Sequence, residues 1–127
     1  MEAIVILTVL ALLQYFWFGI EVGKMRVKHH CHAPATTGAP EFERMFRVQQ
    51  NTLEQLVMFI PALWMFAEWV NPMWAAGMGV VYLVGRTIYR VAYVKDPKGR
   101  SAGFALSVLP TVVMLVWLLV VAVKALI

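Results

Sequence analysis

From Glu41 to Gln55 the chain reads EFERMFRVQQNTLEQ, a polar run that continues directly into an apolar one. On a helix of about 3.6 residues per turn, Arg47, Asn51 and Glu54 stand at i, i+4 and i+7 and share one face. An ionisable side chain at membrane depth costs about 2.5–3.5 kcal/mol, so such groups normally face a bundle interior or a wet cavity. This face is our first candidate for a functional site.

The residues around this segment are overwhelmingly apolar. The chain has 127 residues, of which 61% are hydrophobic and only 14% are charged, whereas a soluble domain is about half apolar and about a quarter charged. The length allows one domain, and no shift in composition suggests a second. Four long apolar stretches are present, at Ala3–Ile20, Leu56–Val70, Pro72–Gly85 and Ala102–Val123.

Only the first and last of these stretches are long enough to cross a bilayer unaided, which takes about 20 residues. The middle two become long enough when the polar turns beside them, Glu43–Gln55 and Arg86–Val94, are counted as helix. We therefore predict an all-α membrane protein, a single four-transmembrane-helix bundle over residues 1–127. The expected helices cover residues 3–28, 41–70, 73–95 and 101–125.

The basic residues gather around two of the three expected connections. By the positive-inside rule, the loops at 24–42 and 95–101 are therefore cytoplasmic, and both termini lie on the opposite side. Because these residues flank helices and accompany no nucleic-acid motif, we expect no nucleic-acid partner. The apolar N-terminus starts with Glu2 and lacks the basic segment of a signal peptide, so we interpret it as a retained first helix.

The third apolar stretch carries a second polar set. Tyr82, Arg86, Tyr89 and Tyr93 fall at i, i+4, i+7 and i+11 and form one stripe on a helix. The tyrosines could instead belong to an aromatic belt at the membrane interface. The arginines of both polar sets could be structural partners of Glu43 or Glu54, since buried charges need partners. Both interpretations stay open beside the site hypothesis.

Together these residues carry a resemblance to a known family. The segment TTGAPEFER at Thr36–Arg44 continues through Arg47 to Glu54, and Tyr89-x-x-x-Tyr93 is followed seven residues later by Arg100. This pattern resembles the MAPEG family, the membrane-associated proteins of eicosanoid and glutathione metabolism. That family includes leukotriene-conjugating synthase and the microsomal glutathione transferases, and the resemblance covers nearly the whole chain.

The resemblance implies a homotrimer that binds glutathione between subunits, as co-substrate and without a metal. One protomer would supply most of the contacts, and its neighbour would supply Arg26 and Gln49. Arg100 would be the catalytic residue, which activates the glutathione sulfur. Two positions depart from the leukotriene-type pattern, because Gln55 stands where a tyrosine is expected and Val27 where an arginine is expected. The contacts of the first protomer would be Arg47, Asn51, Glu54, Tyr89, Tyr93 and Arg100.

These residue types suit that chemistry. Arginines can hold the two glutathione carboxylates through paired hydrogen bonds, and Glu54 can accept from the ammonium. The nucleophile arrives with the substrate, so the protein needs only a cation near the sulfur. Lowering a thiol pKa by about two units requires about 2.7 kcal/mol of preference for the thiolate. We therefore expect a microsomal-type glutathione S-transferase in a bacterial inner membrane, acting on a hydrophobic electrophile that arrives from the bilayer among membrane lipids.

Other functions remain open at this stage. Reduction of lipid hydroperoxides would use the same thiolate, and a non-catalytic lipid-binding or glutathione-binding scaffold would use the same binding residues. A small proton-coupled multidrug exporter also has four helices and a membrane glutamate, here Glu21. His29, His30, Cys31 and His32 invite a metal interpretation, but adjacent residues do not converge on one ion, and we expect no metal site.

Overall fold

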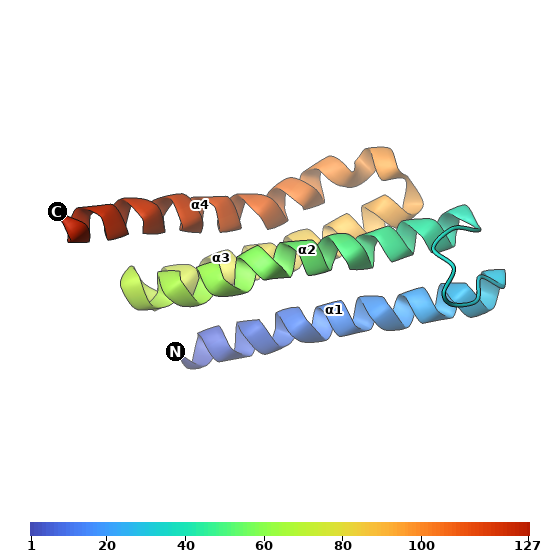
Figure 1. Cartoon of the computed structure of the whole chain (residues 1–127), viewed down its shortest axis with the longest axis horizontal. Coiled ribbons are helices and arrows are strands. Elements are labelled where there is room, and N and C mark those ends of the chain that lie inside the picture. The colour runs from blue at the N-terminus through green and yellow to red at the C-terminus, as the bar shows by residue number, and fades with distance from the viewer.

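The computed structural model describes all 127 residues and is helical almost throughout (Figure 1). The predicted four-helix architecture is confirmed, and each helix end lies within one residue of its expected position. The connection between the last two helices is a short 3₁₀ turn. The elements are α1 (Glu2–His29), α2 (Pro40–Trp69), α3 (Pro72–Lys95), η1 (Pro97–Arg100) and α4 (Ser101–Leu126).

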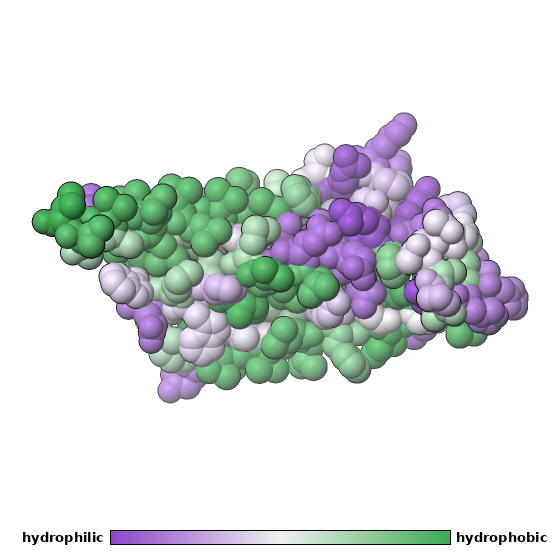
Figure 2. All heavy atoms as spheres, viewed as in Figure 1, coloured by the Kyte–Doolittle hydropathy of each residue, from purple (hydrophilic) through white to green (hydrophobic).

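The four helices run up and down beside one another (Figure 1). Both termini and the α2–α3 turn lie at one end, and the α1–α2 loop and η1 lie at the other. The polar turns of α2 and α3 therefore meet at the second end, which we call the loop end. Figure 2 shows hydrophilic atoms gathered toward the loop end and hydrophobic atoms along the far half of α4.

Local sequence explains where the helices begin. Pro40 occupies the first turn of α2, and Glu41 follows it with a negative charge that opposes the helix dipole. Asn71 caps α3, because its side-chain oxygen accepts hydrogen bonds from the backbone N–H groups of Met73 at 2.8 Å and Trp74 at 3.2 Å. Asp96 caps η1 in the same way. These caps account for the short connections between the helices.

Two helical segments are long and apolar enough to cross a membrane, namely α1 and the continuous η1–α4 segment. Their outward faces are rich in large apolar side chains: Ile6, Leu13 and Phe16 of α1 and Leu109, Val116 and Leu119 of α4 are all exposed. A large exposed apolar surface marks a membrane or protein contact. α2 and α3 carry the polar turns, which lower their hydropathy.

The interior consists of two apolar clusters with a polar layer near their junction. The cluster at the terminal end includes Phe59 and Phe66, and the cluster at the loop end includes Phe18 and Phe42. The polar layer belongs to α2, α3 and α4, and it positions the site described below. Its buried members are Asn51, Thr52, Gln55, Arg86 and Ser107.

Close contact between α3 and α4 depends on two glycines. A Cβ atom added to Gly85 would lie 2.7 Å from the backbone nitrogen of Ser107, and one added to Gly103 would lie 2.6 Å from Cα of Tyr89. Small residues let helix backbones approach closely in membrane bundles. The two glycines therefore bring the start of α4 against the loop-end half of α3.

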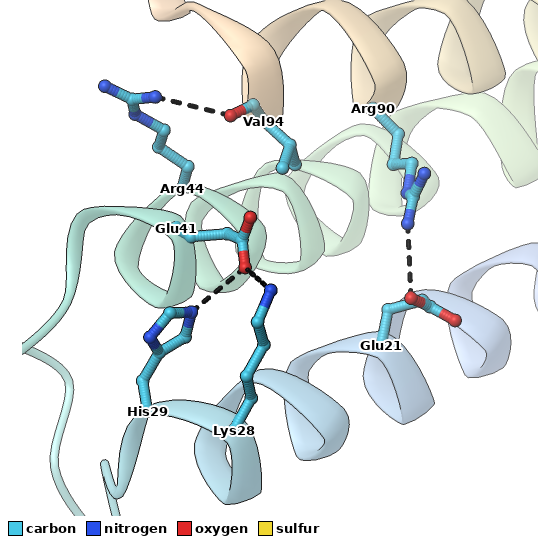
Figure 3. Close-up of polar contacts among 7 residues, drawn as sticks. All are labelled: Glu21, Lys28, His29, Glu41, Arg44, Arg90 and Val94. Carbon is cyan, nitrogen blue, oxygen red and sulfur yellow. Dashed lines mark hydrogen bonds and ion pairs between the residues drawn. The ribbon is translucent and has the colours of Figure 1, made fainter.

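Ion pairs and hydrogen bonds link the helices near the loop end (Figure 3). Glu41 Oε1 lies 2.9 Å from Lys28 Nζ and 3.0 Å from His29 Nε2. Hydrogen bonding with His29 and Lys28 holds the pKa of the Glu41 carboxyl below its usual range. Farther along the bundle, Arg90 of α3 pairs with Glu21 of α1 at 3.2 Å. These contacts join α1 to both α2 and α3.

Candidate functional site

A polar pocket of about 320 Å³ lies between α2, α3 and the start of α4. We call it the inner pocket. It brings together five of the predicted site residues, which come from three separate segments. α2 contributes Arg47 and Asn51, α3 contributes Tyr89 and Tyr93, and the last turn before α4 contributes Arg100. The sixth lining residue is Phe104.

The α2 wall presents a charge and an unpartnered acceptor. Arg47 Nη1 lies 3.2 Å from Glu54 Oε1, and about half of each side chain is exposed. Asn51 is buried, and its Oδ1 atom has no hydrogen-bond partner. A buried carbonyl oxygen without a donor costs free energy unless a ligand or water satisfies it. The wall is therefore suited to a ligand that supplies an N–H group.

The α3 wall is a pair of tyrosine rings. Tyr89 and Tyr93 stack with centroids 5.4 Å apart and an interplanar angle of 27°. The Tyr89 ring also contacts Phe104 of α4, with centroids 6.2 Å apart. Tyr89 is buried, whereas Tyr93 is partly exposed and marks the mouth of the inner pocket. These packed rings hold the α3 side of the pocket in one arrangement.

Arg86 lies beneath this wall and is completely buried. Its guanidinium stands over the Tyr89 ring, 4.2 Å from the centroid. It donates from Nη2 to Thr52 Oγ1 at 2.8 Å and from Nη1 to Ser107 Oγ at 3.3 Å. Arg86 takes part in none of the ion pairs, and its direct polar contacts are two neutral hydroxyls and an aromatic face. The polar layer thus carries a positive charge behind the inner pocket.

Arg100 reaches the inner pocket because of the α3–α4 approach at Gly103. Its side chain is exposed, and Nη1 donates to the Pro97 carbonyl at 3.3 Å. Arg100 also forms no ion pair, so its guanidinium has free hydrogen-bonding capacity toward a ligand. The hydrogen bond to Pro97 stabilises the η1 turn, which is a structural role for Arg100. Arg100 also lines the inner pocket.

Three of the proposed site residues do not line the inner pocket. Glu54 contacts it only through Arg47. Arg26 donates to the carbonyls of Cys31 at 3.1 Å and Ala35 at 2.7 Å, and so fixes the α1–α2 loop. The Gln49 amide lies toward α1, because a Cβ atom on Gly19 would be 3.1 Å from its Nε2. Arg26 and Gln49 therefore face α1 and the loop rather than the inner pocket.

Other sequence expectations also have a place in the structure. Gln55 is buried with its Oε1 unpartnered, and Val27 is exposed. Tyr82 packs in the apolar cluster at the terminal end, stacked on Phe59 with centroids 3.8 Å apart. Glu21, the carboxylate on which the exporter hypothesis rested, is bonded to both Lys24 and Arg90 at 3.2 Å.

Sequence reasoning missed Phe104 as a lining residue. The available signal was its position one helical turn after Arg100, which places both side chains on the same face. An apolar residue on an apolar helix does not stand out in sequence, so this signal was weak. In the structure Phe104 closes the α4 side of the inner pocket.

The fold and the pocket define the class: an all-helical membrane protein whose bundle encloses a polar, arginine-lined site near one end. The chain belongs to the MAPEG family, whose model matches residues 4–120. This is a membrane-associated family, in agreement with the two apolar helices.

Individual relatives are similar over most of the chain. An uncharacterized protein from Synechocystis sp. is 44% identical over 111 residues, which cover 87% of this chain and 81% of that protein. Human microsomal glutathione S-transferase 2 is 43% identical over 100 residues, covering 79% and 68% of the two chains. Leukotriene C4 synthase of Cavia porcellus is 36% identical over 95 residues, covering 75% and 63%.

Proposed function

We propose that this protein is a membrane-bound glutathione transferase that joins the glutathione thiolate to hydrophobic electrophiles. One observation carries the proposal: Arg47, Asn51, Tyr89, Tyr93 and Arg100 come from three separate helical segments and line a single polar pocket. The similarity to microsomal glutathione S-transferase 2 supports the same activity class.

The inner pocket, together with Glu54 beside Arg47, offers a complementary group for each end of glutathione. Arg47 and Arg100 are cations that suit the two carboxylates, and Glu54 suits the ammonium. The unpartnered Oδ1 of Asn51 can accept from a peptide N–H. The buried charge of Arg86 adds a positive field behind the Tyr89 ring. Glutathione is therefore the peptide thiol that we assign to this pocket.

In the proposed reaction the thiol first loses its proton to water, and Arg100 stabilises the resulting thiolate. The sulfur then forms a bond to the electrophilic carbon, and the leaving group departs with the electron pair of the broken bond. Phe104 in the pocket lining and the exposed apolar face of α4 support our proposal that the electrophile arrives from the membrane phase. Reduction of a lipid hydroperoxide would consume two glutathione molecules and yield the disulfide, an alcohol and water.

We further propose that the complete site forms between protomers of a homotrimer. Arg26 and Gln49 face away from the inner pocket of their own protomer, so a contribution from them requires another copy of the chain. The basic residues at the loop end favour a cytoplasmic position for this end, in a bacterial inner membrane. Cysteines introduced at positions 71 and 98 would then react with an impermeant thiol reagent in intact cells only at position 71.

Conjugation of glutathione to a generic aryl halide by purified protein in detergent tests the activity. Wild type should turn over and should show ultraviolet thiolate absorbance when mixed with glutathione. Arg100→Ala should lose that absorbance and slow conjugation by one to a few orders of magnitude, each tenfold corresponding to about 1.4 kcal/mol. Glutathione binding should fall less than turnover, because Arg47 and Asn51 remain.

A non-catalytic scaffold is the second candidate, and one observation favours it. Arg100 is exposed and bonded to the carbonyl of Pro97 in its own turn. If that turn bond is its whole role, Arg100→Ala will leave thiolate absorbance and turnover as they are in wild type. Glutathione binding without any conjugation by wild type would establish the scaffold and end the transferase proposal.

A further inference from the structure

A second polar pocket, of about 420 Å³, adjoins the inner pocket toward the loop end. We call it the outer pocket. It shares Arg47 and Tyr93 with the inner pocket, so the two are contiguous. The outer pocket begins at the first turn of α2, where that helix emerges from the α1–α2 loop. Its full lining is Pro40, Glu43, Arg44, Arg47, Tyr93 and Pro97.

Arg44 supplies the uncompensated charge of the outer pocket. Arg47 is paired with Glu54, whereas Arg44 forms no ion pair. Its Nη1 donates to the backbone carbonyls of Val94 at 3.4 Å and Lys95 at 3.2 Å, at the end of α3. Figure 3 shows the second terminal nitrogen of Arg44 directed away from Val94. One side of the guanidinium is therefore anchored, and the other side is free for a ligand.

Glu43 places an opposite charge next to this cation. One of its carboxylate oxygens, Oε1, accepts from the backbone N–H of Gly38 at 3.0 Å, which fixes the side chain at the pocket edge. An adjacent guanidinium and carboxylate match the carboxylate and ammonium of an amino acid group. A headgroup that carries phosphate without an amine offers no cation to Glu43, whereas an amino acid group supplies both charges.

We propose that the outer pocket is a vestibule that first captures the γ-glutamyl end of glutathione from water and then passes the peptide to the inner pocket. This rests on the proposed function. Arg44 and Arg47 are three residues apart on α2, which separates them by about 5 Å along the helix axis. A carboxylate held by Arg44 therefore needs to move only one helical turn to reach Arg47. In this role Arg44 sets the association rate.

The test is the rate of association of S-methyl glutathione, which carries the charges of glutathione but no thiol, measured by stopped-flow tryptophan fluorescence. Arg44→Gln removes the charge and keeps an amide that can donate to the α3 carbonyls. Lys98→Gln is the matched control, because it removes one exposed charge at the same end but outside both pockets. Arg44→Lys keeps the charge without the planar fork.

We expect Arg44→Gln to lower the association rate constant about three- to tenfold at low ionic strength and to flatten its salt dependence. Dissociation should change less, and Arg44→Lys should retain most of the rate. Lys98→Gln should stay within about twofold of wild type. Equal effects of Arg44→Gln and Lys98→Gln, or no effect of Arg44→Gln, would overturn the vestibule.

Failure of the proposed function gives a different result. Wild type that binds S-methyl glutathione with an Arg44-dependent rate, yet conjugates no aryl halide, would remove the transferase activity and leave the vestibule in place. If wild type conjugates glutathione but its association rate does not depend on Arg44, the transferase activity stands and the vestibule is overturned. Wild type that does not bind S-methyl glutathione overturns the vestibule as stated.

Discussion

At the scale of single residues, the arginines near the site differ in the groups that compensate their charge. Arg47 has a carboxylate partner in Glu54, Arg90 has one in Glu21, and Arg86 has only hydroxyls and a ring. Placing a guanidinium in an apolar bundle is costly unless its hydrogen bonds are satisfied. A buried cation without a carboxylate is therefore expected to serve a ligand that brings a negative charge.

Arg86→Met tests whether Arg86 serves function rather than stability. Methionine is apolar and long enough to fill the space, and replacing a buried charge by an apolar group of similar volume is often neutral or stabilising by about 1–4 kcal/mol. The hydroxyls of Thr52 and Ser107 keep their donor bonds to the carbonyls of Val48 and Gly103. We expect an unchanged or higher thermal midpoint in detergent together with weaker glutathione binding.

The companion variant Arg86→Ala serves as its control. It removes the same charge but leaves a cavity, so its thermal midpoint should fall. A large fall for Arg86→Met as well, with glutathione affinity retained, would show that the residue is needed for packing and not for the ligand. Calorimetric titration with glutathione measures the affinity, and thermal unfolding measures the stability.

At the scale of helices, the position of Arg100 and Phe104 depends on how closely α4 approaches α3. Arg100 precedes α4 and Phe104 lies in its first turn, so any displacement of this helix moves both away from the tyrosines. The approach is closest at Gly103, where an added methyl group would overlap the backbone of Tyr89. Backbone atoms cannot yield as a flexible side chain can.

Gly103→Ala should therefore destabilise the bundle. Overpacking of this kind costs about 1–3 kcal/mol, which outweighs the gain of about 1 kcal/mol that alanine brings to a helix. Conjugation should also fall, because Arg100 is displaced. Gly77→Ala is the control, since no neighbouring atom lies within 4 Å of the added Cβ and the helix should be stabilised. In thermal unfolding in detergent, the midpoint should fall for Gly103→Ala and rise for Gly77→Ala. A Gly103→Ala variant that is as stable and as active as wild type would contradict this prediction.

At the scale of the whole molecule, much of the apolar surface of α4 has no partner within one chain. Lipid covers such a surface in a monomer, and neighbouring subunits cover part of it in the proposed trimer. The proposed trimer also explains why Arg26 and Gln49 face away from their own inner pocket. A site shared between protomers makes a specific prediction about mixed assemblies.

Co-expression of two differently tagged inactive variants, Arg26→Ala and Arg47→Ala, tests the shared site. After tandem purification every trimer contains both variants, so about a third of the sites should combine an intact Arg47 from one protomer with an intact Arg26 from its neighbour. Conjugation should then recover to about that fraction of wild type. If both residues act within one protomer, every site carries a defect and the mixture will remain as inactive as its parents.

The sequence by itself determined the class of the protein and the ends of its helices. These features depend on local interactions: runs of apolar residues, a proline at the start of α2, and the capping side chains of Asn71 and Asp96. Helical periodicity alone also predicts that Arg47 and Asn51 share one helix face, and that Tyr89 and Tyr93 share another. The resemblance to a family then grouped these residues into one hypothesis.

Only the tertiary structure decided which side chains meet. Helical periodicity puts Arg86 on the tyrosine stripe and Arg90 off it, but it does not predict that Arg86 is fully buried without a carboxylate whereas Arg90 is paired with Glu21. The same holds for the anchoring of Arg44 on the end of α3 and for Phe104 in the inner pocket. The physical reason is that these contacts depend on the distance and rotation of neighbouring helices, which packing at Gly85 and Gly103 sets and helical periodicity does not encode.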